Sequence, residues 1–121
     1  MMALRFRGRN RSIELMKVFL TIPGIGLAKA GFCCQLFAGC VGCIDRHNIR
    51  RLRLPPNILT FNKKAAATTR QKRIEAYVDA CQKRGCKWLW NSWCRLIAKK
   101  YPDKFPNAEA VSFVHLGYLI G

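Results

Sequence analysis

Acidic residues are scarce in this chain. Among its 121 residues there are 6 Asp and Glu against 22 Lys and Arg, so the net charge is +16. A compact chain with so large an excess repels itself unless a polyanion neutralises it. We therefore expect an acidic partner, with nucleic acid first and an anionic membrane surface second. The basic residues are spread along the chain, and this distribution favours nucleic acid.

The sequence also lacks an apolar run long enough to span a bilayer, which takes about 20 residues. The uncharged stretch 30–44 is too short, and Lys17, Pro23 and Lys29 interrupt the apolar residues before it. The N-terminal arginines followed by apolar residues imitate a signal peptide, but no cleavage site follows. We expect no membrane partner, and a cytoplasmic or nucleoid-associated protein that is not secreted.

The cysteines do not form the paired framework of a small secreted domain. Their number is odd, and several lie on apolar helical faces, where a free cysteine behaves as a small hydrophobic residue. Cys40 and Cys43 with His47 offer three zinc ligands, but no second close pair completes a compact site. We expect reduced thiols, no bound metal and no cofactor. The seven cysteines stand at positions 33, 34, 40, 43, 81, 86 and 94.

The main functional signal is the segment 22–30, which reads Ile-Pro-Gly-Ile-Gly-Leu-Ala-Lys-Ala between two apolar helical patterns. This is the form of a helix-hairpin-helix element. Its glycines allow a turn that a Cβ would strain, and Ala30 lets two helices cross closely. Such a turn presents backbone N–H groups at the start of a helix, where a DNA phosphate can bind. The alternative is an ordinary hairpin inside a helical core. The candidate DNA contacts are Gly24, Ile25, Gly26 and Lys29.

The expected fold is all-α, a small helical domain built around this motif, because no repeat and no strong alternating pattern is present. Helices are expected over about 13–20, 27–38, 46–53, 70–84, 87–100 and 108–120. Ser12, Asp45 and Asn107 can cap the first, third and last of these. The chain divides into a basic arm that is mobile until it binds (1–11), the hairpin with the Asp45 helix (12–56), a connector (57–69) and a C-terminal helical part of the same domain (70–121).

Together with the later segment 42–52, the hairpin resembles the helix-hairpin-helix DNA glycosylases of the endonuclease III superfamily. In that family a Leu-Pro-Gly-Val-Gly hairpin is followed by a Val-Asp-Thr-His segment that leads into a helix with Arg and Leu. Here the second segment contains Cys-Ile-Asp-Arg-His-Asn and leads into an arginine-rich helix. The resemblance covers about residues 20–54, less than a third of the chain. Further candidates for DNA contacts in this segment are Arg46, His47, Arg50 and Arg51.

The resemblance implies a catalytic role for Asp45, which matches the aspartate that helps to generate the nucleophile and stabilises positive charge developing on the sugar. A carboxylate at a helix N-terminus has its charge stabilised, and it would attract an oxocarbenium-like centre. A capping aspartate without any chemistry explains the residue equally well.

Three departures from the family matter. Ala28 stands where bifunctional members carry their lysine nucleophile, so a glycosylase here would be monofunctional. About 20 residues precede the hairpin, where the family builds much of a helical barrel, and the family's iron–sulfur cysteine spacing is absent. The base pocket would have to come from residues 70–121 or from another subunit, which leaves a homo-oligomer open. Two hypotheses therefore stand: a reduced monofunctional glycosylase that uses Asp45, or a non-enzymatic architectural or replication-packaging DNA-binding protein.

Three tryptophans lie close together in the helix expected over 87–100. Trp93 shares an apolar stripe with Leu89 and is expected in the core. Trp88 and Trp90 flank that stripe, where they either pack in the core or in a subunit interface, or stack on bases.

Overall fold

The computed structural model describes residues 6–107 of the protein. Within this range the fold is all-helical, as predicted, and no strand occurs. The predicted helix over 108–120 lies outside the described residues. In chain order the elements are the π-helical turn η1 (Phe6–Asn10), α2 (Arg11–Leu20), α3 (Leu27–Ala38), α4 (Arg46–Leu52), the 3-10 turn η2 (Pro56–Leu59), α5 (Ala67–Arg84) and α6 (Cys86–Lys100).

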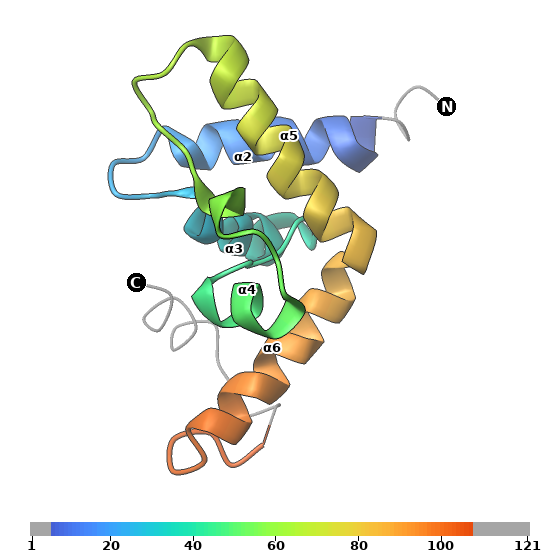
Figure 1. The fold of residues 1–121 in the computed structure, drawn as a ribbon. Coiled ribbons are helices and arrows are strands. Elements are labelled where there is room, and N and C mark those ends of the chain that lie inside the picture. Colours follow the sequence, from blue (N-terminus) through green and yellow to red (C-terminus); the bar gives the residue numbers. More distant parts are fainter. Residues whose placement is uncertain (1–5, 108–121) are drawn as a thin grey trace.

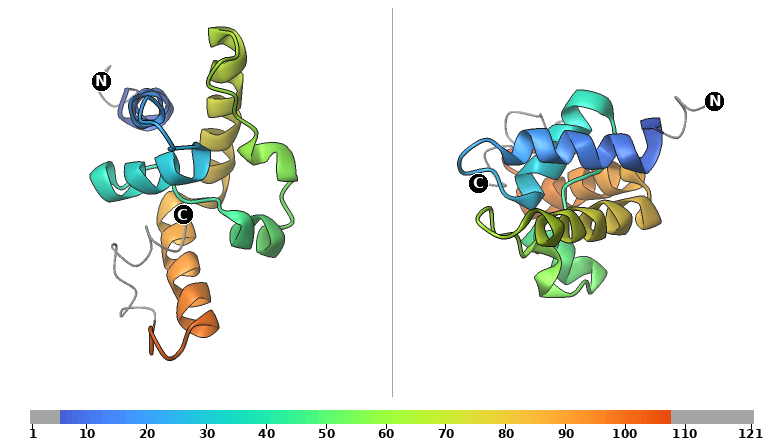
Figure 2. Two further views of the ribbon diagram at one scale, coloured as in Figure 1. Left: turned by 90° about the vertical axis from the view of Figure 1, so that its left-hand side faces the viewer. Right: turned by 90° about the horizontal axis from the view of Figure 1, so that it is seen from above.

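The helices cross one another and do not line up as a parallel bundle (Figure 1). Helix α2 packs against both α3 and α5, and α6 follows α5 after a bend at Gly85 (Figure 2). The turn η2 packs against α5, and side-chain hydrogen bonds connect α4 and its N-cap residue to α6. The loop between α2 and α3 lies at the same end of the molecule as the loop that leads into α5 (Figure 1).

The residue types near the ends of the helices predicted several of these ends correctly. Helix α3 spans the predicted residues and ends at Gly39, whose φ of +65° is left-handed. The N–H of Gly39 donates a hydrogen bond to Gln35 O at 3.0 Å. Gly85 ends α5 with a φ of +91°. Both glycines adopt a backbone conformation that side chains with a Cβ disfavour. Asp45 caps α4, as predicted.

The start of the chain differs from the prediction. Ser12 does not cap α2: the helix begins at Arg11, the N-cap residue is Asn10, and Ser12 is buried inside the helix. The prediction assumed that a serine before an apolar pattern lies at the helix boundary, but the preceding turn η1 continues directly into α2.

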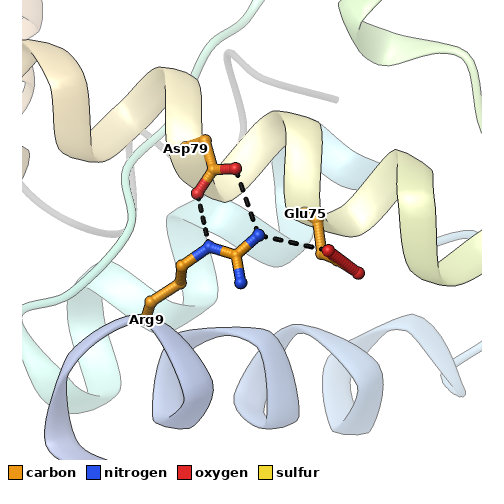
Figure 3. A network of polar contacts seen from close by, with 3 residues as sticks. All are labelled: Arg9, Glu75 and Asp79. Carbon is orange, nitrogen blue, oxygen red and sulfur yellow. Dashed lines mark hydrogen bonds and ion pairs between the residues drawn. The ribbon is translucent and has the colours of Figure 1, made fainter. Parts of the chain in front are cut away.

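Within the predicted basic arm, the turn η1 is kinked at Gly8, whose ψ of −124° is not helical, and Arg9 attaches this turn to α5. Arg9 Nε lies 2.7 Å from Asp79 Oδ1, and Arg9 Nη2 lies 3.1 Å from Glu75 Oε1 (Figure 3). The hydrogen bond to Asp79, followed by that to Glu75, raises the pKa of Arg9. Two of the six acidic residues are therefore used to hold the arm. The connector is also shorter than predicted, since η2 lies within it and α5 begins at Ala67.

The core consists of two clusters of buried side chains. The larger cluster joins α2, α3, the connection 39–45 and α5, and it includes the predicted stripe Ile74, Tyr77, Val78 and Cys81. The smaller cluster joins α6 to α3 and to the loop after α6. All seven cysteines are free, and four of them are buried in or beside these clusters. Within residues 6–107, no helix combines the length and the apolar character needed to cross a membrane.

Candidate nucleic-acid interface

The predicted hairpin is an exposed turn between α2 and α3. Ile25 N donates to Ile22 O at 3.2 Å and closes the turn, and Ala30 N donates to Gly26 O at 2.9 Å and opens α3. Ile25 packs against the larger core cluster, which anchors the turn, whereas Ile22 is 47% exposed. The glycines between and after them face solvent. Ile25 therefore anchors the hairpin to the core, while Gly24 and Gly26 stay exposed to solvent.

The two hairpin glycines differ in their backbone conformation. Gly24 has a φ of +82°, which strains any residue with a Cβ. Gly26 has a φ of −96° and a ψ of −169°, an extended conformation open to all residues. A Cβ built on either glycine has no other atom within 4 Å. The expectation that a Cβ would strain the turn is thus confirmed at Gly24 and wrong at Gly26, whose extended backbone any residue can adopt.

The first turn of α3 has no side-chain cap. Gly26 occupies the N-cap position and has no side-chain oxygen that could accept a hydrogen bond from the first N–H groups of the helix. No acidic residue lies in that turn, and Lys29 adds a half-exposed cation. Uncapped N–H groups together with the positive end of the helix dipole form a site that favours an anion.

Among the described glycines, Gly31, one residue beyond the predicted crossing position Ala30, has the closest neighbouring atoms. A Cβ at Gly31 would lie 2.1 Å from Gly42 O and 2.6 Å from the Tyr77 hydroxyl. Ala30 is itself fully buried. Helix α3 therefore lies directly on the backbone of the connection 39–45. A glycine inside an otherwise apolar helix was the sequence signal for this contact.

Tyr77 of α5 fixes the same connection. Its hydroxyl donates to Gly42 O at 2.7 Å and accepts a hydrogen bond from Ile44 N at 2.8 Å. The side chain is fully buried, and this burial raises its pKa well above the ordinary value. Sequence reasoning placed Tyr77 on an apolar stripe and missed this polar role, because the partners lie more than 30 residues away. Asp45 is the last residue of this connection.

Asp45 is buried, with 7% of its surface exposed. Its Oδ1 accepts a hydrogen bond from Asn48 N at 2.9 Å, which caps α4. Its Oδ2 accepts a hydrogen bond from the indole N–H of Trp93, also at 2.9 Å. Both carboxylate oxygens thus have protein donors. This confirms the capping role, and it also confirms that Trp93 belongs to the core.

Asn48 and Arg51 continue this network on α4. Asn48 is completely buried; its Nδ2 donates to Cys43 O, and its Oδ1 accepts from Arg51 Nη2, each at 2.7 Å. The Arg51 guanidinium also lies over the Trp88 ring, 5.3 Å from its centroid. Partial desolvation lowers the pKa of Arg51. Arg51, predicted as a DNA contact, is exposed and also contacts Asn48 and Trp88 within the protein.

The other predicted contacts on α4 are Arg46, His47 and Arg50. Arg46 and Arg50 are exposed. His47 is half-buried, and its Nδ1 lies 3.0 Å from Lys100 Nζ on α6. The predicted contacts thus fall into two groups, one on the hairpin and one on α4. Side-chain hydrogen bonds tie the hairpin to the loop before α5, and α4 to α6.

A pocket of about 500 Å³ opens beside the hairpin and not beside Asp45. A second, shallower pocket of about 210 Å³ is lined by Leu52, Arg84 and Trp88. Neither of these two pockets is lined by Asp45.

No protein-family model, curated protein or solved structure matches this chain. The resemblance to helix-hairpin-helix glycosylases therefore rests on its two motifs.

Proposed function

We propose that this protein binds the phosphate backbone of DNA through the hairpin 21–26 and the start of α3, with no chemical step. The observation that carries the proposal is the start of α3, which has no side-chain cap and begins at the exposed Gly26, on a chain of net charge +16. Backbone N–H groups at such a turn bind phosphate oxygens without reading bases. We therefore expect the affinity to depend little on the base sequence of the DNA.

The exposed cations supply the remaining affinity in this proposal. Arg46 and Arg50 project from α4, and Lys29 adds a cation on α3 near the hairpin. Each phosphate neutralised releases counterions from DNA, so affinity should fall steeply as salt rises.

A binding protein fits the surroundings of Asp45 better than the monofunctional glycosylase that the resemblance implies. A catalytic carboxylate must reach water and the sugar, and the Asp45 oxygens instead accept hydrogen bonds from Asn48 N and Trp93 Nε1 in a buried site. A glycosylase also needs a pocket for a flipped base. The pocket of about 500 Å³ lies elsewhere.

Gly26→Val tests the hairpin with little risk to the fold. The extended φ and the open space allow the valine, while its branched side chain covers the adjacent N–H groups. We expect the affinity for a duplex, measured by fluorescence anisotropy, to fall about tenfold, as expected for a lost charge-assisted hydrogen bond. Gln82→Val, at an exposed position on α5, is the matched control and should bind normally. Unchanged binding by a folded Gly26→Val protein would remove the hairpin from the interface.

A lesion panel separates the two hypotheses. Duplexes that carry damaged or mismatched bases are incubated with the protein and then treated with alkali to cleave abasic sites. We expect binding without base release. Release that disappears in Asp45→Asn would establish the glycosylase instead, and a covalent adduct trapped by borohydride would identify an amine nucleophile such as Lys29.

A further inference from the structure

The pocket of about 500 Å³ next to the hairpin has the size of a small-molecule site, which is typically about 300–1,000 Å³. It lies between the end of α2, the loop before α5 and the first turns of α5, segments that lie at one end of the molecule (Figure 1). Its lining residues are Lys17, Leu20, Thr21, Phe61, Lys63, Ala67, Arg70, Gln71 and Ile74.

The lining combines apolar and cationic side chains. Leu20 and Ile74 belong to the buried core, and Phe61 packs against that core from the loop. Lys17, Lys63 and Arg70 supply three positive charges, and the lining contains no carboxylate. Lys17 Nζ lies 3.3 Å from Oε1 of Glu14, whose side chain is 70% exposed.

Hydrogen bonds hold two of the cations in place. Lys63 Nζ donates to Ile22 O of the hairpin at 2.7 Å, and Arg70 Nη1 donates to Lys63 O at 3.1 Å. The hairpin, the loop and α5 are thus linked around the pocket. Cations that are already positioned lose less conformational entropy when an anion binds.

The start of α5 adds to this positive field. Ala67, the first residue of this 18-residue helix, lines the pocket. The N-cap residue Ala66 has no side-chain hydrogen bond to the first turn, and no acid lies in that turn. The positive end of the helix dipole therefore reinforces the three cations.

We propose that this pocket binds a nucleoside monophosphate, with the base on the apolar floor near Phe61 and the phosphate among Lys17, Lys63 and Arg70. A phosphomonoester carries about −1.5 to −2 charge at pH 7, which suits three cations better than the single charge of a phosphodiester. A flat base buries apolar surface and can stack on an aromatic ring. The ligand is either a free nucleotide or the phosphorylated end of a DNA strand held by the hairpin; the second source rests on the proposed function.

The first experiment compares ligands on the full-length protein by isothermal titration calorimetry and anisotropy. The free ligands are adenosine 5′-monophosphate, adenosine and inorganic phosphate. The strands are one labelled oligonucleotide with a 5′-phosphate, one with a 3′-phosphate and one with hydroxyls at both ends. We expect the monophosphate to bind about tenfold more tightly than either of its parts, or one phosphorylated strand to bind about tenfold more tightly than the hydroxyl strand.

Matched variants then locate the site. Lys17→Gln removes a cation whose side chain contacts Glu14 at the surface, and Lys72→Gln removes an exposed cation from α5 outside the pocket. Lys17→Gln should abolish most of the preference for the phosphorylated ligand, and Lys72→Gln should preserve it. Phe61→Leu should weaken the monophosphate but not inorganic phosphate, because it removes the aromatic ring alone. Circular dichroism checks that each variant is folded.

The outcomes separate this inference from the proposed function. DNA binding with no preference for a phosphorylated end and no monophosphate binding would overturn the inference and leave the proposed function standing. Monophosphate binding without DNA binding would support the pocket with a free nucleotide and overturn the proposed function. Equal binding of inorganic phosphate and the monophosphate, or equal losses in Lys17→Gln and Lys72→Gln, would overturn the nucleotide site.

Discussion

Trp93 donates its indole N–H to Oδ2 of Asp45 at 2.9 Å, across 48 residues of sequence. The bond connects the residue that starts α4 to the smaller core cluster around α6. Since Oδ1 already caps α4, the carboxylate ties two helices together in a buried site. Asp45 therefore holds α4 against α6 through both of its carboxylate oxygens.

Asp45→Asn should lower the free energy of unfolding by about 1–3 kcal/mol, the cost of leaving a buried polar group unsatisfied. The amide oxygen can still cap α4, but the amide NH₂ then faces the Trp93 N–H, and both groups are donors. Urea denaturation measures the change, and duplex affinity should stay close to that of the parent. In the double variant with Trp93→Phe, the combined loss should be smaller than the sum of the single losses. Additive losses would contradict the coupling.

Gly31→Ala should destabilise the protein by about 3 kcal/mol, at the upper end of the cost of overpacking. A glycine inside a helix normally gains stability from this substitution, but here the new Cβ would lie 2.1 Å from Gly42 O. Gly26→Ala is the control, because its backbone is extended and its surroundings are open. Thermal unfolding of the two variants gives the comparison. A more stable Gly31→Ala protein would show that α3 and the connection 39–45 do not approach this closely.

Arg50 and Arg51 should respond differently to the same substitution. Arg50→Gln removes an exposed cation, so the slope of log affinity against log salt should fall by about 1 with little loss of stability. Arg51→Gln removes a hydrogen bond to Asn48 and a cation over Trp88, so unfolding free energy should fall by about 1–2 kcal/mol. Salt titrations and urea denaturation test both variants. Equal stabilities would contradict the assigned role of Arg51.

Cys40 should be the first cysteine to react with iodoacetamide at pH 7. A hydrogen bond with Cys34, supported by Ser12 and the charge of Arg11, lowers the pKa of Cys40, so more thiolate is present at this pH. Burial raises the pKa of Cys33 and Cys86, and raises that of Cys94 to about 11. Mass spectrometry of labelled peptides identifies the reacting site, with Cys40→Ser as the control. Faster labelling of Cys86, which is also half-buried, would contradict this order.

The sequence by itself determined the helical class, the bounds of α3, the glycine stops at Gly39 and Gly85, and the cap at Asp45. These features depend on backbone dihedral angles and on bonds between residues three to four positions apart, so nearby residue types are enough to predict them. Ser12 shows where a prediction from nearby residue types fails. A capping residue type marks a helix start only if the preceding backbone is not itself helical, and here η1 continues into α2.

Only the tertiary structure decided which polar groups are left for a ligand. Arg50 and Arg51 are the same residue type one position apart, yet a helix turns them about 100° from each other, and only Arg51 meets Trp88. The pocket gathers Lys17, Lys63 and Arg70 from three segments, because α2 packs on α5. Local sequence cannot specify such contacts, since they depend on which distant segments bury their apolar faces together.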